Sequence, residues 1–226
     1  MTRIASLLFA LTLFVPGSPA QTATPPSVQA QGTATIAVTP NQAQLTVSMT
    51  TNGTTAQDAG QQNATLTAAV IAALQKQAGA SGTIQTVSYS VSPRYNNPTP
   101  TQPAAIVGYS ATNTVQLTLT NLTLIGGAID AATQAGATSV SNLTLGLQDP
   151  QPSLQAALTA AAKIALANAS AIASGLGGKT GAVISAQQSS SYTPIPVAVA
   201  VMAAATPIQT GPISVSATVV VTVALQ

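Results

Sequence analysis

The chain has 226 residues, of which only 4% are charged, and it contains no histidine, cysteine or tryptophan. Beyond residue 20 its only carboxylate side chains are Asp58, Asp130 and Asp149. General acid–base catalysis, activated nucleophiles and transition-metal sites draw mainly on His, Cys and clustered carboxylates. The composition therefore predicts no catalytic residue, no metal site and no cofactor, and it argues against an enzyme.

The first 20 residues have the pattern of a secretory signal peptide. Arg3 supplies the positive start, residues 4–15 form an apolar segment, and Ser18-Pro19-Ala20 offers small residues for cleavage. An apolar segment of this length is too short to span a bilayer, which needs about 20 residues in a helix. An uncleaved anchor is the alternative. We expect export, followed by a flexible Pro/Thr/Gln-rich lead-in over residues 21–31.

The charges that remain after the signal are four cations, Lys76, Arg94, Lys163 and Lys179, and the three aspartates, a net charge of +1. Four scattered cations do not form the basic patch that nucleic-acid binding requires. So little charge also gives little repulsion between molecules, which favours association. We therefore expect no nucleic-acid partner and a homo-oligomer, and we leave membrane contact open.

The first half of the remaining chain alternates strand and helix patterns. Period-two alternation of apolar residues predicts strands. Either Thr54 with Gln57 or Thr55 with Asp58 fits a capping box for a helix that ends before Gly79. Tyr89 and Tyr109 share the parity of apolar strand residues, which predicts that they pack in the core. The expected segments are strands at 34–38 and 45–49, a helix at 55–78, and strands at 87–91 and 109–119.

The second half repeats these kinds of segment. A short helix at 122–132 and a strand at 143–147 precede a long helix that begins at Asp149-Pro150 and ends at Gly177-Gly178. Strands at 182–186 and 213–225 complete the chain. The stripe that we expect this helix to bury is Leu154, Leu158, Ala161, Ala165, Ile172 and Leu176.

This order predicts an α+β fold in which two similar strand–helix–strand–strand halves are joined by a short helix. Amphipathic helices cover one face of a largely antiparallel sheet. Because no linker separates the halves, we expect a single unit over residues 32–226.

Several short motifs occur in an order that resembles a known family. They are Thr39-Pro40-Asn41-Gln42-Ala43, Ser90-Val91-Ser92-Pro93-Arg94-Tyr95, Gly108-Tyr109-Ser110-Ala111-Thr112-Asn113-Thr114-Val115, Ala135-Gly136-Ala137, Gln148-Asp149-Pro150 and Gly211-Pro212-Ile213-Ser214-Val215-Ser216-Ala217-Thr218-Val219. Together they are similar to the SIMPL-domain proteins of the bacterial envelope, which include periplasmic immunogenic antigens and an oxidative-stress defence protein. The resemblance implies an exported protein in the periplasm or at the outer envelope, with large oligomers in some members and no agreed catalytic residues.

The chain departs from the family pattern in two places. Asn41 stands where the family usually has Asp, and the long helix lacks most of the usual charged outer face.

Two surfaces are candidates for a ligand or contact site. Arg94 and Tyr95 lie beside a Pro-rich loop at 96–103, and loops carry function more often than packed strands. The uncharged apolar run at 195–205 is either a hairpin loop that lies on its own domain or an exposed contact surface. The residues of this run that we single out are Ile195, Val197, Val199, Val201 and Met202.

The final strand is the candidate subunit edge, through Val215, Val219, Val221 and Val223. It has high β-propensity and no charge, proline or glycine, so as a free edge it would promote aggregation. It is therefore either central in its sheet or paired across a subunit boundary.

These observations favour a non-enzymatic, self-associating envelope protein with a structural or stress-protective role. The alternative is a periplasmic binding module for a small polar or peptide ligand, with Arg94 and Tyr95 in the site.

Overall fold

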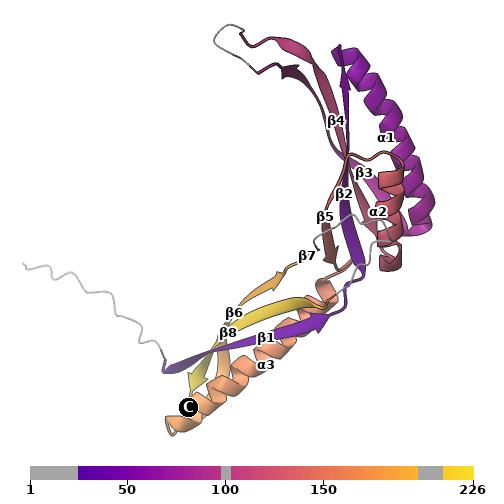
Figure 1. Cartoon of the computed structure of the whole chain (residues 1–226). Helices are drawn as coiled ribbons and strands as arrows, with labels where there is room; N and C mark the ends of the chain where they lie inside the picture. Colours follow the sequence, from indigo (N-terminus) through magenta and orange to yellow (C-terminus); the bar gives the residue numbers. More distant parts are fainter. Residues whose placement is uncertain (1–24, 98–102, 198–210) are drawn as a thin grey trace, which may run out of the picture.

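The computed structural model describes residues 25–97, 103–197 and 211–226 (Figure 1). The expected signal peptide lies outside these residues, as do Val199, Val201 and Met202 of the apolar run. The elements are β1 (Ser27–Val38), β2 (Gln42–Gly53), α1 (Ala56–Ala78), β3 (Gly82–Tyr95), β4 (Ile106–Leu119), α2 (Ile125–Gln134), β5 (Ser139–Gly146), α3 (Gln151–Gly175), β6 (Thr180–Tyr192), β7 (Ile195–Val197) and β8 (Ile213–Leu225).

The strands form two antiparallel sheets with separate cores. The large lobe has the strand order β3-β4-β2-β5-β7 and is covered by α1 and α2, whereas the small lobe has the order β1-β8-β6 and is covered by α3 (Figure 1). The predicted α+β class, with helices on antiparallel sheet, is confirmed. In each lobe one strand lies between two others beneath a long helix: β4 between β2 and β3, and β8 between β1 and β6.

The two lobes exchange strands across the sequence. β1 comes from the first half but pairs with β8 along its whole length, from Ser27 opposite Ala224 to Val38 opposite Ile213. β5 comes from the second half but pairs with β2. The similar halves are therefore interlaced rather than consecutive. Both exchanged strands tie the first half to the second.

Strand β1 begins inside the segment that we expected to be a flexible lead-in. Residues 27–31 pair with β8, and Val28 and Ala30 are buried against the small-lobe core. The prediction is wrong for these five residues. Only two apolar residues, Val28 and Ala30, alternate with polar ones in this stretch, which is too few to indicate a strand from the sequence.

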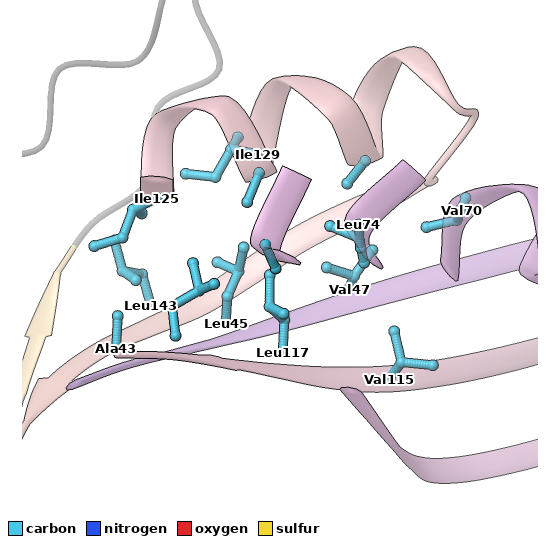
Figure 2. Close-up of a cluster of buried hydrophobic side chains, with 14 of the residues drawn as sticks. Ala43, Leu45, Val47, Val70, Leu74, Val115, Leu117, Ile125, Ile129 and Leu143 are labelled. Atoms are coloured by element: carbon cyan, nitrogen blue, oxygen red, sulfur yellow. The ribbon is translucent and has the colours of Figure 1, made fainter. Parts of the chain in front are cut away.

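Large aliphatic side chains fill the core of the large lobe. Ile125 and Ile129 of α2 lie above Leu45 and Leu143 of the sheet, and Leu74 comes from α1 (Figure 2). All five are at most 1% exposed. Burying a side chain of this size contributes about 1.5–3 kcal/mol, so this cluster is the main stabilising element of the lobe.

The small lobe is packed through alanine instead. The buried face of α3 consists of Ala157, Ala161, Ala165, Ala169 and Ala173. A Cβ atom at Gly32 of β1 would lie 2.2 Å from the carbonyl oxygen of Ala161 and 2.4 Å from the amide nitrogen of Ala165. The helix backbone therefore lies directly on the strand, and only the smallest side chains fit between them.

This close contact changes the predicted buried stripe of α3. Ala161 and Ala165 are buried as expected, and Leu154 and Leu158 pack partly against the core. Ile172 and Leu176 are exposed at 44% and 67%, so the prediction is wrong for both. Long side chains would hold the helix away from Gly32, and they lie outside the contact instead.

Tyr89 also differs from its prediction. Its side chain is 54% exposed, because β3 is an edge strand and α1 lies mainly over β2 and β4. Tyr109, in the inner strand β4, is partly buried.

Polar contacts hold the junction between the lobes. The Gln148 N–H donates a hydrogen bond of 2.7 Å to Oδ1 of Asn41, and the Asn41 N–H donates one of 3.0 Å to the Gly146 carbonyl. The Tyr192 hydroxyl, from β6, accepts from the Leu147 N–H. Strands of both sheets are thereby joined where β5 leads into α3.

Candidate functional site

Strand β8, the predicted subunit edge, lies in the middle of the small sheet. β1 pairs with one side of it and β6 with the other. The four valines that we singled out, Val215, Val219, Val221 and Val223, are at most 6% exposed. The subunit-edge prediction is therefore wrong for β8, and the central alternative holds. β8 has no free backbone edge with which to bind another chain.

Four other strands lie at sheet edges in the part of the chain that the structure describes, and three of them are protected. β7 spans three residues and contains Pro196, and β3 carries Pro93, Arg94 and two register shifts. On β1 the Nδ2 atom of Asn168 donates to the Gln31 carbonyl at 2.8 Å. Proline, charge, irregular pairing and covering side chains are the features with which proteins block edge pairing.

Strand β6 lacks such protection over its second half. Its register shifts occur before Ser185, and from Ala186 to Tyr192 it pairs residue by residue with β8. These seven residues, Ala-Gln-Gln-Ser-Ser-Ser-Tyr, contain no charge, proline or glycine, and those from Ala186 to Ser191 are exposed. Val183 and Ile184 at its start are also more than half exposed. This regular outer edge of β6 is the first candidate interaction surface.

A polar cavity of about 470 Å³ forms the second candidate site. It lies between the first turns of α1 and the ends of β2, β3 and β4, and Arg94 contributes to its wall. Of the two residues predicted here, Arg94 thus lines a cavity. Tyr95 does not line the cavity; it pairs with Ile106 and is 58% exposed.

The first turn of α1 supplies the opposite charge of this cavity. Thr55 is the N-cap, and its hydroxyl accepts the Asp58 N–H at 3.1 Å, so of the two predicted capping pairs the structure has Thr55 with Asp58 and not Thr54 with Gln57. The Thr54 hydroxyl donates to Oδ2 of Asp58, also at 3.1 Å. Hydrogen bonds from the Thr55 and Thr54 hydroxyls hold the pKa of Asp58 below its ordinary value, so the carboxylate is ionised at neutral pH.

The described start of the apolar run lies on the protein itself. Ile195 pairs with Leu145 of β5 and packs partly against the small-lobe core, and Val197 pairs with Leu143. For these two residues the structure agrees with the alternative in which the run lies on its own domain.

Sequence reasoning missed the buried polar residue Asn63. Its Nδ2 atom donates to the carbonyls of Met49 and Ala111, at 2.9 and 3.0 Å, and its side chain is fully buried. It joins α1 to two strands and has a structural role. The signal was available, because Asn63 lies four residues after Ala59 on the buried face of α1.

Among the described elements, α3 is the one helix whose length and hydropathy would suffice to cross a membrane, and 28% of the relevant stretch is buried in the fold. Its alanines raise the hydropathy and lie against the small sheet, while Ile164 and Leu166 are partly exposed. We interpret α3 as a helix that covers this sheet.

Two of the motifs that resemble the family, those with Asn41 and Gln148, are joined by a hydrogen bond, and a third, with Gly108, lies close to β2. Asn41 accepts a hydrogen bond from the Gln148 N–H, and either Asn or Asp offers the required oxygen. At Gly108 a Cβ atom would lie 2.8 Å from the Gly53 carbonyl oxygen, so the β4 backbone approaches β2 closely.

A comparison with known protein families supports the resemblance to SIMPL-domain proteins. The family model SIMPL, described as a protein of unknown function (DUF541), matches residues 28–223. No curated protein matches the chain. The family is generally associated with exported proteins. Because the match extends over nearly all of the sequence, the chain belongs to the SIMPL family.

Proposed function

We propose that this protein is an exported, non-enzymatic component of the bacterial cell envelope that self-associates and has a structural or stress-protective role. The main support for this proposal is the regular outer edge of β6 from Ala186 to Tyr192. An edge strand presents unpaired N–H and C=O groups that can pair with a strand of another chain.

The surroundings of this edge also favour association between identical chains. No charged residue lies between Lys179 and the end of β6, so two copies of this strand do not repel each other. Exposed Val183 and Ile184 add apolar surface at the same strand, and exposed Leu176 precedes it. A second β6 strand, paired antiparallel, would satisfy the backbone groups of both copies.

Light scattering after size exclusion, without detergent, tests this proposal. We expect a discrete oligomer for the exported protein and a monomer for the double variant Gln187→Lys, Ser189→Lys, whose added charges lie on exposed positions of β6. The matched control is Gln155→Lys, Thr159→Lys, which adds the same charge to the exposed face of α3 and should leave the oligomer intact. Circular dichroism should show the same fold for all three proteins.

Two results would contradict the proposal. One is a monomeric wild-type protein over a hundredfold range of concentration, and the other is an oligomer that persists in the β6 variant.

The second candidate function is binding of a small polar or peptide ligand. The cavity that contains Arg94 favours it, because a volume of about 470 Å³ lies within the range of small-molecule sites, about 300–1,000 Å³. Exposed amide and charged side chains line this cavity, which suits a polar ligand. Changes in NMR amide shifts at α1 and β3 on addition of such a ligand would support this function.

A further inference from the structure

The charge pattern of the Arg94 cavity indicates what kind of ligand it fits. Beyond residue 20 the chain has seven charged side chains, and two of them, Arg94 and Asp58, line this one cavity. Arg94 comes from the end of β3 and Asp58 from the first turn of α1, so the cavity has a cationic and an anionic wall. A site with both charges disfavours a simple anion or a simple cation and suits a molecule that carries both.

The two charges are available to a ligand because no ion pair joins the Arg94 guanidinium to the Asp58 carboxylate. The carboxylate takes its hydrogen bonds from the Thr55 and Thr54 hydroxyls instead. A guanidinium binds a carboxylate through two parallel N–H···O bonds, and a carboxylate accepts N–H donors from an ammonium group.

Neutral polar side chains complete the wall. Asn52, Gln61 and Gln62 carry amides, which offer both donors and acceptors at the level of the first turns of α1. These groups match the N–H and C=O groups of a peptide bond. Val107 provides a single apolar contact, which a small side chain such as a methyl group would satisfy.

We propose that this cavity binds a short peptide with free ends, its carboxylate at Arg94 and its ammonium group at Asp58, with the side-chain amides of Asn52, Gln61 and Gln62 facing the peptide bond. This inference rests on the second candidate function and names its ligand class. It does not depend on self-association.

An NMR titration of the exported protein with three related dipeptides tests the proposal. The probes are Ala-Ala, N-acetyl-Ala-Ala, which lacks the ammonium group, and Ala-Ala amide, which lacks the carboxylate. We expect Ala-Ala to shift the amides of residues 52–62, 94 and 107, and each blocked form to bind about tenfold more weakly, as loss of one charge-assisted contact predicts.

Single-charge variants assign each end of the peptide. Arg94→Gln should bind Ala-Ala and its amide equally weakly, and Asp58→Asn should no longer distinguish Ala-Ala from its acetylated form. Lys163→Gln is the matched control, because it removes one charge from an exposed position of α3 and should leave affinity unchanged.

The titrations distinguish a wrong ligand class from the absence of any binding site in this cavity. Glucose, added in a separate titration, is an uncharged polar probe of the same cavity. If the blocked peptides or glucose bind there as well as Ala-Ala does, the cavity is a ligand site but the free-ended peptide is the wrong class. If Ala-Ala, both blocked forms and glucose all fail to shift these amides, the peptide site and the binding function are both contradicted. Shifts confined to other elements would also overturn the proposal.

Discussion

The two lobes differ in the side chains that pack between helix and sheet. In the large lobe, the first turn of α1 lies on β2 at Gly53, but along the rest of α1 and along α2 Leu, Ile, Val and Met side chains fill the space above the sheet. In the small lobe, α3 lies against β1 through alanines, with Gly32 at the contact. The large lobe therefore depends on buried aliphatic volume, whereas the small lobe depends on the absence of side chains at a backbone contact.

This difference has a consequence for the surface. A helix that packs through alanine leaves its longer apolar residues outside the core, as Ile164, Leu166 and Ile172 of α3 show. The same lobe contains the unprotected edge of β6. The small lobe thus contains the strand edge that we propose for association, and the large lobe contains the polar cavity at Arg94.

The largest expected effect comes from adding a side chain at the backbone contact. Gly32→Ala should destabilise the protein by about 3 kcal/mol or more, at the upper end of overpacking effects, because backbone atoms of α3 occupy the space of the added Cβ. Urea denaturation measures this loss.

Gly60→Ala is the matched change in the large lobe, where the nearest atom is the movable Tyr89 hydroxyl at 3.2 Å. It should stabilise α1 by up to about 1 kcal/mol. Equal losses at both glycines would contradict the comparison.

A second pair of variants compares similar polar contacts in the two lobes. Asn63 and Asn168 each donate from a helix to a strand carbonyl, but Asn63 is buried and Asn168 is exposed. We expect Asn63→Leu to lower the free energy of unfolding by about 1–3 kcal/mol, because two carbonyls lose a buried donor. Asn168→Leu should lower it by about 0.5–1 kcal/mol at most. Chemical denaturation of both variants decides the order, and a larger loss at Asn168 would refute it.

The junction between the lobes gives a smaller effect. Asn41→Ala removes the acceptor of the Gln148 N–H and should lower stability by about 1 kcal/mol. Asn41→Asp keeps an acceptor oxygen in place and should stay close to wild type. If thermal unfolding shows Asn41→Asp to be as unstable as Asn41→Ala, the hydrogen bond does not account for the residue.

The smallest effect is the pH dependence at the start of α1. Because hydrogen bonds lower the pKa of Asp58 in the folded state, its contribution is fully present above the unfolded value of 3.8 and is lost as pH falls through the folded value. The difference in melting temperature between wild type and Asp58→Asn should therefore be constant near neutral pH and should shrink on acidification below about pH 4. A difference that does not change with pH would contradict this account.

The element order was predictable from local pattern, because alternation, capping residues and glycine stops are encoded within each segment. The cap at Thr55 and Asp58 and the end of α1 before Gly79 are examples. The partners of the strands were not predictable in this way. Nothing local to β1 shows that it pairs with β8, and the alternation in β8 is the same for a central strand and for an edge.

The buried face of α3 shows a second limit of sequence reasoning. Hydrophobicity favours Ile172 and Leu176 as core residues over alanine, but the distance between helix and sheet is determined by Gly32, far away in the sequence. The cavity at Arg94 likewise depends on residues that are far apart in the sequence. Arg94 was identifiable as one of few charges beside a loop, whereas its neighbours in the cavity, including Asp58, come together only through the pairing of β2 with β4.

Amide hydrogen exchange along β6 shows directly whether this strand pairs with a second chain. In an oligomer joined through this edge, the outward-pointing amides between Ala186 and Tyr192 are hydrogen-bonded to a second chain. We predict that their exchange slows as protein concentration rises, while amides in the exposed hairpin end of β3 are unaffected. Fast exchange of the β6 amides at every concentration, in a protein that is nevertheless oligomeric, would contradict the assignment of β6 as the contact strand.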